Sequence, residues 1–448
     1  MIYASDIFCF PSITKNEAFG LALAEAMYYE KPAITFTIPG SGVNYVNLND
    51  ETGIEVDNRN VKKYAEAIEK LAEDKNLRKK YGEAGRMRVM NNFLSTQYSE
   101  NIRNLVKEMI TEYTLMIITK TPFRMSFFGG GTDMENYFRE NGGAVLSTTF
   151  DKYCYVNVRH LPRFFDYSTE LSYSKTERVA DVENIQHPAI RNAMKLLDMH
   201  EIRLTYEADL PARSGLGTSS SFAVGMLNAF YALKGKYADK KKLADEAIYL
   251  ERILCKEAGG WQDQIAASFG GFNRINFDAD GYEVLPVIIS PERKKQLNEN
   301  LMMFFTGFTR FSSDVQKANN ITASDKKAQL KEMYVLVDNA ERVLTEKERS
   351  LHDFGYLLDH TWKLKRQTGS AISTNSIDAL YQKGIKAGAL GGKLLGAGGG
   401  GFLVFYVQPE KQEAVHWAMK DLMYIPFQFE NGGTRIIHYT PETYEPRA

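Results

Sequence analysis

The chain has 448 residues, of which 44% are hydrophobic and 25% are charged, as in an ordinary globular protein. Because a single domain typically has about 100–200 residues, this length predicts two or three domains. The 55 lysines and arginines balance 56 aspartates and glutamates, which argues against nucleic-acid or membrane-surface binding, since both need a basic surface. Three cysteines, Cys9, Cys154 and Cys255, exclude a disulfide framework and are typical of a reducing compartment. We find no signal peptide and no apolar run of roughly 20 residues, so we expect a cytoplasmic protein with no membrane partner.

The first part of the chain alternates predicted strands and helices. Strands are expected at 6–10, 32–36 and 53–56, a helix at 18–29, and charged helices between about 61 and 109. This alternation predicts a parallel sheet. The segment begins partway through such a fold, so we expect residues 1–110 to form an incomplete Rossmann-like α/β domain.

The second part, 116–448, mixes strands and helices less regularly, and this pattern predicts an α+β fold. The strands expected from apolar runs are 117–120, 153–159, 202–207, 272–276, 301–305 and 402–408. The helices expected from the apolar spacing are 222–233, 240–257, 328–348 and 412–423.

A glycine-rich loop in the second part carries the strongest chemical signal. It starts at Pro211, has Gly215 and Gly217 on either side of Leu216, and continues into a run of hydroxyl residues: Thr218, Ser219, Ser220 and Ser221. Glycines let backbone N–H groups approach an anion, and a helix start adds unpaired N–H groups and a positive dipole end. The alternative is a glycine turn with serine caps. The segment is not a Walker A loop, because no Gly-Lys-Ser/Thr follows.

Three further segments combine glycines with charged residues or a strand. Gly398, Gly399 and Gly400 belong to a glycine run before an apolar strand, which favours close approach to a ligand or to the first loop over a flexible hairpin. Arg124 and Asp133 flank a second glycine turn, formed by Gly129, Gly130 and Gly131. Asp263 follows Gly259-Gly260, twelve residues after Glu251 on a predicted helix. Taken alone, Asp133 and Asp263 are each also explained as helix caps.

In their order along the chain, these four segments resemble those of the GHMP kinases, a family named for galactokinase, homoserine kinase, mevalonate kinase and phosphomevalonate kinase. The resemblance covers 116–448, and PFRMSFFGGGTD and GGWQDQIAASFGG are most similar to kinases of D-glycero-D-manno-heptose 7-phosphate. It implies an α+β kinase with lobes at 116–300 and 301–448, ATP and Mg²⁺ as cofactors, and a small-molecule sugar phosphate as partner. The implied reaction phosphorylates the anomeric hydroxyl, toward nucleotide-activated heptose for a surface polysaccharide. An L-fucose or other sugar 1-kinase and a non-catalytic sugar-binding protein stay open as alternatives.

The resemblance also implies a role for each segment. The loop from Pro211 to Ser221 would hold the ATP phosphates, and Ser219 and Glu251 would bind Mg²⁺. Asp263 would accept the proton of the sugar hydroxyl with Arg124 beside it. The segment Gly129–Asp133 would bind the sugar, and Gly398–Gly400 would help to close the site.

A sugar that already carries a phosphate needs basic residues to receive it. The candidates in the sequence are Arg159, His160, Arg163, Lys175 and Arg178. The alternative is ordinary solvated surface charge, and the sequence leaves the oligomeric state open.

The first part resembles the nucleotide-sugar-binding half of a GT-B retaining glycosyltransferase. The resemblance rests on ASDIFCFPS and on Glu17 and Glu25, which stand eight residues apart as in that family. These residues would be vestiges of a nucleotide-sugar site. Because the acceptor domain and the first strands of the donor domain are missing, we expect no transferase activity from 1–110.

Overall fold

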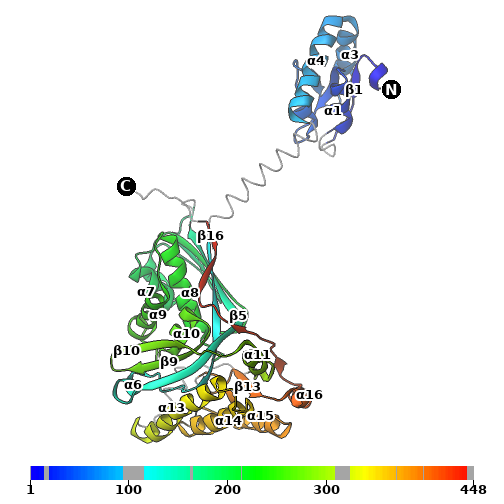
Figure 1. Cartoon of the computed structure of the whole chain (residues 1–448). Coiled ribbons are helices and arrows are strands. Elements are labelled where there is room, and N and C mark those ends of the chain that lie inside the picture. The colour runs from blue at the N-terminus through cyan, green and yellow to red at the C-terminus, as the bar shows by residue number, and fades with distance from the viewer. Residues whose placement is uncertain are drawn as a thin grey trace. The chain divides into compact units, whose positions relative to one another are not determined.

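The computed structural model describes residues 2–14, 20–93, 116–161, 165–212, 214–307, 323–369, 371–396 and 398–440. The chain divides into two compact units, Met1–Thr114 and Leu115–Ala448 (Figure 1). We call them the N-terminal unit and the large unit. Within the described ranges, no helix has both the length and the apolar character needed to cross a membrane.

The N-terminal unit contains a parallel sheet of order β1-β2-β3, as the alternation predicted. Its strands are β1 (Phe8–Phe10), β2 (Ala33–Thr37) and β3 (Gly53–Asp57). Its helical elements are a 3₁₀ turn (Ile2–Ala4), α1 (Leu21–Tyr28), α2 (Val43–Val46), α3 (Val61–Glu73) and α4 (Lys75–Asn92).

One residue divides the charged helical run of the N-terminal unit. Asp74 lies between α3 and α4, and its carboxylate accepts a hydrogen bond from Leu77 N at 2.8 Å. An aspartate that caps the second helix in this way stops the first from continuing. The core of the unit packs the apolar faces of these helices onto β2, where Ile34 and Phe36 are buried.

The large unit has two sheets. The first contains β4 (Ile117–Phe128), β5 (Gly143–His160), β6 (Thr169–Ser172), β7 (Thr176–Val179), β8 (Ile202–Ala208), β9 (Phe272–Asp278), β10 (Gly281–Pro286), β15 (Phe429–Glu430) and β16 (Arg435–Tyr439). The second is antiparallel, with order β12-β13-β11-β14, and contains β11 (Leu301–Phe305), β12 (Gly391–Leu394), β13 (Phe402–Tyr406) and β14 (Met423–Tyr424).

The helices of the large unit cover these sheets. They are α6 (Glu135–Asn141), a 3₁₀ turn (Val182–Asn184), α7 (Pro188–Leu196), α8 (Thr218–Leu233), α9 (Lys240–Ile248), a π-helical segment (Tyr249–Leu254), α10 (Gln262–Phe269), α11 (Pro291–Glu299), α13 (Ala323–Thr345), α14 (His352–Gln367), α15 (Asn375–Lys386) and α16 (Pro409–Ala418).

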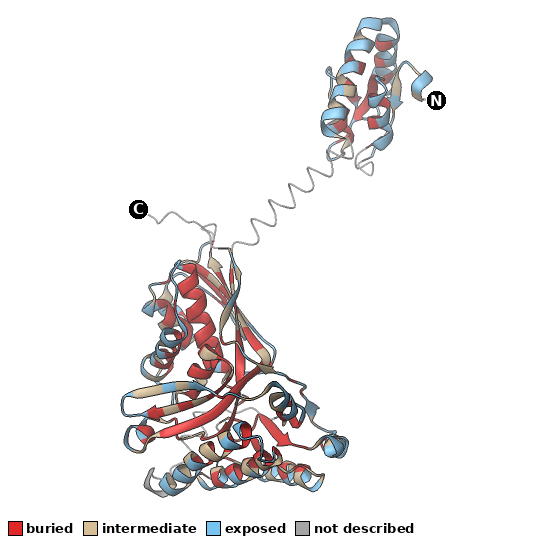
Figure 2. Cartoon of the chain, viewed as in Figure 1, coloured by how far each residue is buried: buried red, intermediate tan, exposed pale blue. Residues whose placement is uncertain are grey.

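The long strand β5 organises the first sheet, because it pairs with β4, β8, β9 and β15 along its length. Helix α8 packs against β4 and β5, and Figure 2 shows it as the most continuously buried helix of this view. The strand expected at 117–120 is in fact β4, which continues to Phe128. The sequence conceals this extension, because residues 121–128 are all buried and show no alternation of polar and apolar positions.

The core between the two sheets positions the rest of the molecule. Phe127 at the end of β4 stacks on Phe272 of β9 and contacts Phe354 of α14 edge to face, with ring centroids 5.7 Å and 5.2 Å apart. Tyr406 of β13 belongs to the same cluster. This packing holds the end of β4, strand β9 and the second sheet next to each other.

Candidate active site

An arginine–aspartate pair lies at the centre of the glycine-rich segments. Strand β4 presents Arg124, and the first turn of α10 presents Asp263. Arg124 Nε donates to Asp263 Oδ1 at 2.7 Å and Nη2 donates to Oδ2 at 3.0 Å. The arginine side chain is 5% exposed and the aspartate 25%. The two parallel hydrogen bonds fix the carboxylate in one orientation while leaving it accessible to a small molecule.

The first glycine loop wraps around this pair. Arg124 Nη1 also donates to the carbonyl oxygen of Gly215 at 2.7 Å. Gly215 and Gly217 have φ values of +81° and +71°, which favour glycine. A Cβ on Gly217 would lie 3.2 Å from Arg124 Cγ and 3.4 Å from the Asp263 carboxylate. The loop therefore touches the pair through bare backbone and leads directly into α8, whose first N–H groups suit an anion.

The second glycine loop packs against the first, as the sequence predicted. Cβ atoms on Gly215 or Gly396 would overlap with the backbone of the other loop, and one on Gly401 would overlap with the Ser214 carbonyl. Gly399 N donates to the Ile372 carbonyl at 3.0 Å. Gly398 and Gly399 therefore pack against the backbone of Ile372, and Ala397 lies outside the described residues.

The start of α8 is joined to a buried glutamate. Glu251 lies on the π-helical segment, a local widening that often occurs at functional sites. Ser219 Oγ donates to Glu251 Oε1 at 3.0 Å, and Ser220 Oγ donates to Oε2 at 2.7 Å. Gln264 Nε2 also donates to Oε2. The structure thus brings together the two residues expected to bind Mg²⁺, with Ser219 on the exposed side.

Asp133 does not cap the helix that follows it, since α6 begins after Met134. Its carboxylate instead accepts Gly131 N at 2.8 Å and Gln262 N at 3.3 Å. Burial and the nearby negative charge of Asp263 raise the pKa of Asp133, although the hydrogen bond from Gly131 lowers it. Asp133 therefore connects the glycine turn 129–131 to the start of α10, which carries Asp263.

Two buried polar side chains beside this turn were missed by the sequence interpretation. Ser126 Oγ and Gln262 Nε2 would each lie 3.7 Å from a Cβ on Gly130. Ser126 Oγ and Gln262 Oε1 have no hydrogen-bond partner among the described residues, although both side chains are buried. Buried polar atoms are nearly always paired, so these two favour a polar ligand at the turn. Gln262 is next to Asp263 in the sequence, which is the only signal that pointed to it.

Two lysines of the C-terminal half were also missed. Lys365 of α14 is half-buried and donates to the Gly396 carbonyl. Lys393 of β12 is 1% exposed and donates to the Phe127 carbonyl at 2.8 Å. The segment WKLKRQ around Lys365 has the appearance of a solvated helix face, so it offered no signal.

Aromatic side chains gather beyond the start of α8. Phe222 follows the hydroxyl run, and its ring centroid lies 4.8 Å from that of Tyr206 and 5.6 Å from that of His187. Tyr173 contacts His187 edge to face at 5.0 Å. This aromatic cluster packs around Phe222 in the first turns of α8.

Most basic residues considered for a second phosphate lie far from the pair. Arg124 is in register with Thr149 of β5, whereas Arg159 lies ten residues further along that strand. At about 3.3 Å per residue, Arg159 and His160 are roughly 30 Å away. Arg178 lies in the same cross-strand row as Arg159 and is ion-paired with Glu170 at 2.9 Å. Lys175 donates to Gln186, and Arg163 lies outside the described residues.

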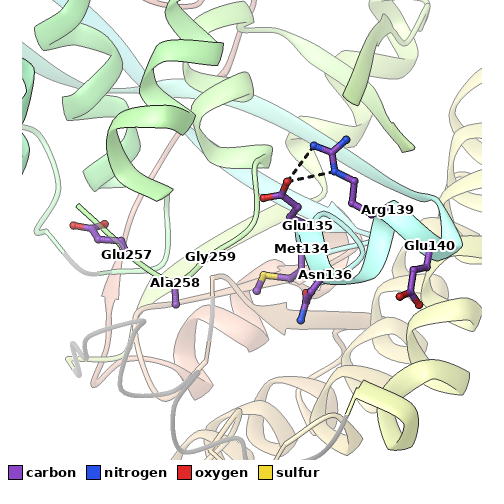
Figure 3. A pocket seen from close by; sticks show the side chains of 8 residues that line it. All are labelled: Met134, Glu135, Asn136, Arg139, Glu140, Glu257, Ala258 and Gly259. Carbon is purple, nitrogen blue, oxygen red and sulfur yellow. Dashed lines mark hydrogen bonds and ion pairs between the residues drawn. The ribbon is translucent and has the colours of Figure 1, made fainter. Parts of the chain in front are cut away.

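A hollow of about 540 Å³ lies beside Asp133, between the start of α6 and the segment 257–259 (Figure 3). Its charged lining consists of Glu135, Glu140, Glu257 and Arg139. Arg139 is already paired with Glu135 at 3.0 Å, as the dashed lines in Figure 3 show. The net charge of this lining is negative, so it disfavours a phosphate group.

In the N-terminal unit, Glu25 is exposed on α1, and Glu17 lies outside the described residues. The proposed eight-residue pair therefore cannot be placed as a pair.

The family model for glycosyl transferases group 1 matches residues 1–88. Models for the N-terminal and C-terminal domains of GHMP kinases match residues 184–271 and 339–425.

Individual proteins agree with these matches. A D-glycero-alpha-D-manno-heptose 7-phosphate kinase of Campylobacter jejuni is 31% identical over 316 residues, 66% of this chain and 91% of the relative. An L-fucokinase/L-fucose-1-P guanylyltransferase of Bacteroides fragilis is 30% identical over 227 residues, 48% of this chain but 23% of that protein. A crystal structure described as a D-glycero-D-manno-heptose 1-phosphate kinase from Bacteroides thetaiotaomicron superimposes with a TM-score of 0.58 and 23% identity, over 73% of this chain and all of that one.

Proposed function

Since the chain belongs to the GHMP kinase family and is an ATP-dependent sugar kinase, we propose that it phosphorylates the anomeric hydroxyl of D-glycero-D-manno-heptose 7-phosphate. The observation that carries this proposal is the bidentate Arg124–Asp263 pair held under the first glycine loop. The substrate is taken from the Campylobacter jejuni relative, of which the match covers 91%. Such a product would lead toward nucleotide-activated heptose, and ATP as co-substrate fits the cytoplasm.

In the proposed reaction, Asp263 accepts the proton of the anomeric hydroxyl as its oxygen attacks the γ-phosphorus of ATP. The hydrogen bonds from Arg124 aim the carboxylate and offset its charge. Phosphoryl transfer needs positioning and charge neutralisation more than covalent chemistry. The Arg124–Asp263 pair would supply both the positioning and the charge neutralisation. Arg124 is already fixed in place, because it also donates a hydrogen bond to the Gly215 carbonyl oxygen.

The first glycine loop and the start of α8 suit the triphosphate, and the aromatic cluster around Phe222 would receive the base. Ser219 and Glu251 fit Mg²⁺, which prefers oxygen ligands at about 2.0–2.1 Å in octahedral geometry. Their oxygens are 3.0 Å apart, about the separation of two neighbouring ligands in such geometry. Ser220 and Gln264 occupy only Oε2 of the glutamate, so Oε1 is the oxygen available to the metal. When bound, Mg²⁺ would neutralise phosphate charge.

The turn 129–131 would hold the sugar against Asp133, Ser126 and Gln262. The unpaired oxygens of Ser126 and Gln262 supply the hydrogen-bonding capacity that sugar hydroxyls require. A site built this way rejects sugars that lack the matching hydroxyl, because its buried polar groups are then left unpaired.

The test is ADP release by the purified chain with ATP and Mg²⁺, using heptose 7-phosphate, L-fucose, galactose and mannose as acceptors. Asp263→Asn should lower kcat by at least about 10³-fold while ATP still binds, since the proton acceptor is lost. Asp421→Asn, an exposed aspartate in the same unit, is the matched control and should keep normal turnover. Turnover of Asp263→Asn within threefold of the natural chain would remove Asp263 from the mechanism.

L-Fucose is the second candidate substrate, and the hollow beside Asp133 favours it. Its lining has Glu135, Glu140 and Glu257, and an uncharged sugar fits there more readily than a sugar phosphate. The Bacteroides fragilis relative is in line with this alternative. Phosphorylation of L-fucose but not of heptose 7-phosphate would establish it over the first candidate.

We further propose that the N-terminal unit contributes nothing to this reaction, since every residue to which we assign a role in the reaction lies in the large unit. Removing residues 1–115 should leave kcat and both KM values within about twofold, and a collapse of soluble, active protein would show that the units depend on each other.

A further inference from the structure

Lys365 reaches the reaction centre from the C-terminal half of the large unit. Helix α14 carries it, and its ammonium group donates to the Gly396 carbonyl. Gly396 packs directly on Gly215, whose own carbonyl accepts Arg124 Nη1 at 2.7 Å. Arg124 and Lys365 therefore approach the junction of the two glycine loops from different elements, one through each loop.

The charges around Lys365 show what it is close to. Burial lowers the pKa of Lys365 to about 8, and the positive charge of Arg124 acts in the same direction. Asp133 and Asp263 act in the opposite direction. The ammonium group thus shares one electrostatic environment with Arg124 and Asp263, and with Asp133, whose carboxylate is proposed to bind the sugar.

Lys393 lies in the same electrostatic environment. Burial, followed by the charges of Lys365 and Arg124, lowers the pKa of Lys393 well below its usual value. Cations in a partly dry site repel each other, and an added anion that binds between them relieves this repulsion. Phosphoryl transfer brings such an anion to Asp263, with charge spread over its non-bridging oxygens.

We propose that Lys365 is a catalytic residue that binds the phosphoryl group in transit, donating N–H hydrogen bonds to its non-bridging oxygens. The proposal rests on the proposed function. The bond between the γ-phosphorus and the β–γ bridging oxygen breaks, the bond from the anomeric oxygen to that phosphorus forms, the hydroxyl proton passes to Asp263, and ADP leaves. Lys365 exchanges no proton in this step and stabilises charge only, as electrostatic donors do in other transfer enzymes.

A phosphate already present on the acceptor is the other possible source of this anion. The geometry favours the transferred group, because Lys365 is tied to the junction of the glycine loops and shares its environment with Arg124 and Asp263. Neither Lys365 nor Gly396 lines the hollow beside Asp133, whose charged residues are three glutamates and Arg139. The test below separates the two sources by using acceptors with and without their own phosphate.

The experiment measures kcat, KM and ATP-analogue binding for Lys365→Met and Lys365→Arg in the full chain. The acceptors are heptose 7-phosphate and heptose without phosphate, or whichever sugar the natural chain accepts. The matched control is Lys363→Met, which removes an exposed lysine of the same helix. We expect Lys365→Met to lower kcat about 10²-fold with both acceptors and to leave ATP-analogue affinity within threefold. The kcat of Lys365→Arg should be at least about tenfold higher than that of Lys365→Met.

A second readout is the pH dependence of kcat/KM, which reports groups of the free enzyme. Lys365 is charged below its pKa, so kcat/KM of the natural chain should fall as pH rises above about 8. Lys365→Arg should move this fall to higher pH, because arginine stays charged. The groups that share the environment of Lys365 are Arg124 on β4, Asp133, Asp263 on α10 and Lys393 on β12, and these are present in every variant.

Two outcomes would overturn the proposal, and a third would separate it from the proposed substrate. A kcat of Lys365→Met within threefold of the natural chain would limit Lys365 to holding the loop. A loss seen only with the phosphorylated acceptor would assign Lys365 to the acceptor's own phosphate. If the natural chain phosphorylates another sugar but not heptose 7-phosphate, the proposed substrate fails while the Lys365 comparison still stands on that sugar.

Discussion

Replacing Gly217 by alanine tests whether bare backbone under the Arg124–Asp263 pair is required for turnover. Gly217 precedes α8 and has a φ of +71°. A Cβ there would lie 3.2 Å from Arg124 Cγ and 3.4 Å from Asp263 Oδ2. Gly235, just beyond the other end of α8, has a φ of +64°, and a Cβ at that position would have nothing within 4 Å. The two glycines therefore share the backbone strain and differ in what the added methyl group meets.

The expected magnitudes follow from these two contributions. A left-handed conformation costs an alanine about 1–2 kcal/mol, so both variants should lose that much stability. Carbon–carbon contacts are optimal at about 3.5–4.0 Å, so only in Gly217→Ala must the pair retreat from the new methyl group, by a few tenths of an ångström. Since a displacement of about 1 Å costs roughly 10²-fold in rate, we expect Gly217→Ala to lower kcat about tenfold, or about 1.4 kcal/mol.

The assay compares kcat and urea unfolding for Gly217→Ala and Gly235→Ala. The tryptophans of the chain all lie in the large unit, so their fluorescence follows the unfolding of this unit alone. Similar losses of stability with a fall in kcat for Gly217→Ala alone would support the reasoning. Equal kcat values for the two variants would refute it, because the contact with the pair would then have no effect on turnover.

Three further predictions concern stability, loop packing and the metal. Burial raises the pKa of Glu430, but hydrogen bonds from Tyr153 and its other partners hold it at about 2 against an ordinary value of 4.5. A lowered folded-state pKa stabilises the fold above about pH 4.5, and this stabilisation is lost as the pH falls toward 2. Glu430→Gln should therefore lower the free energy of unfolding in urea by about 3 kcal/mol at pH 7 and by about half as much at pH 3. The same loss of unfolding free energy at both pH values would contradict this prediction. Gly401→Ala should reduce ATP-analogue affinity at least about tenfold, since its Cβ overlaps with the Ser214 carbonyl, and unchanged affinity would show that the loops need not touch. Glu251→Gln should raise the Mg²⁺ concentration for half-maximal activity at least about tenfold, and an unchanged Mg²⁺ titration would remove Glu251 as a ligand.

The glycine segments could be assigned from sequence because they depend on local chemistry. A loop of Gly215 and Gly217 before a hydroxyl-rich helix indicates an anion site wherever it occurs. The contact between the two glycine loops was also foreseeable, since glycine runs are costly without close backbone approach. The parallel sheet of the N-terminal unit followed from alternating strands and helices.

Other features of the site depend on residues that are far apart in the chain. Lys365 lies on an ordinary charged helix, and only the packing of α14 against the second sheet turns it toward Gly396. Asp133 looked like a helix cap, but the fold directs its carboxylate to the start of α10. The distance between Arg159 and Arg124 was hidden until the length and register of β5 were known.

Local sequence patterns were sufficient to predict the chemistry that we propose for this protein: glycine loops for phosphates, an acid–base pair and oxygen ligands for a metal. The fold then determines which charged side chains share one site, because a charge acts over a few ångströms in space regardless of its place in the chain. That is why the near-neutral overall balance of 55 against 56 charges is compatible with a local group of Arg124, Lys365 and Lys393 near Asp133 and Asp263.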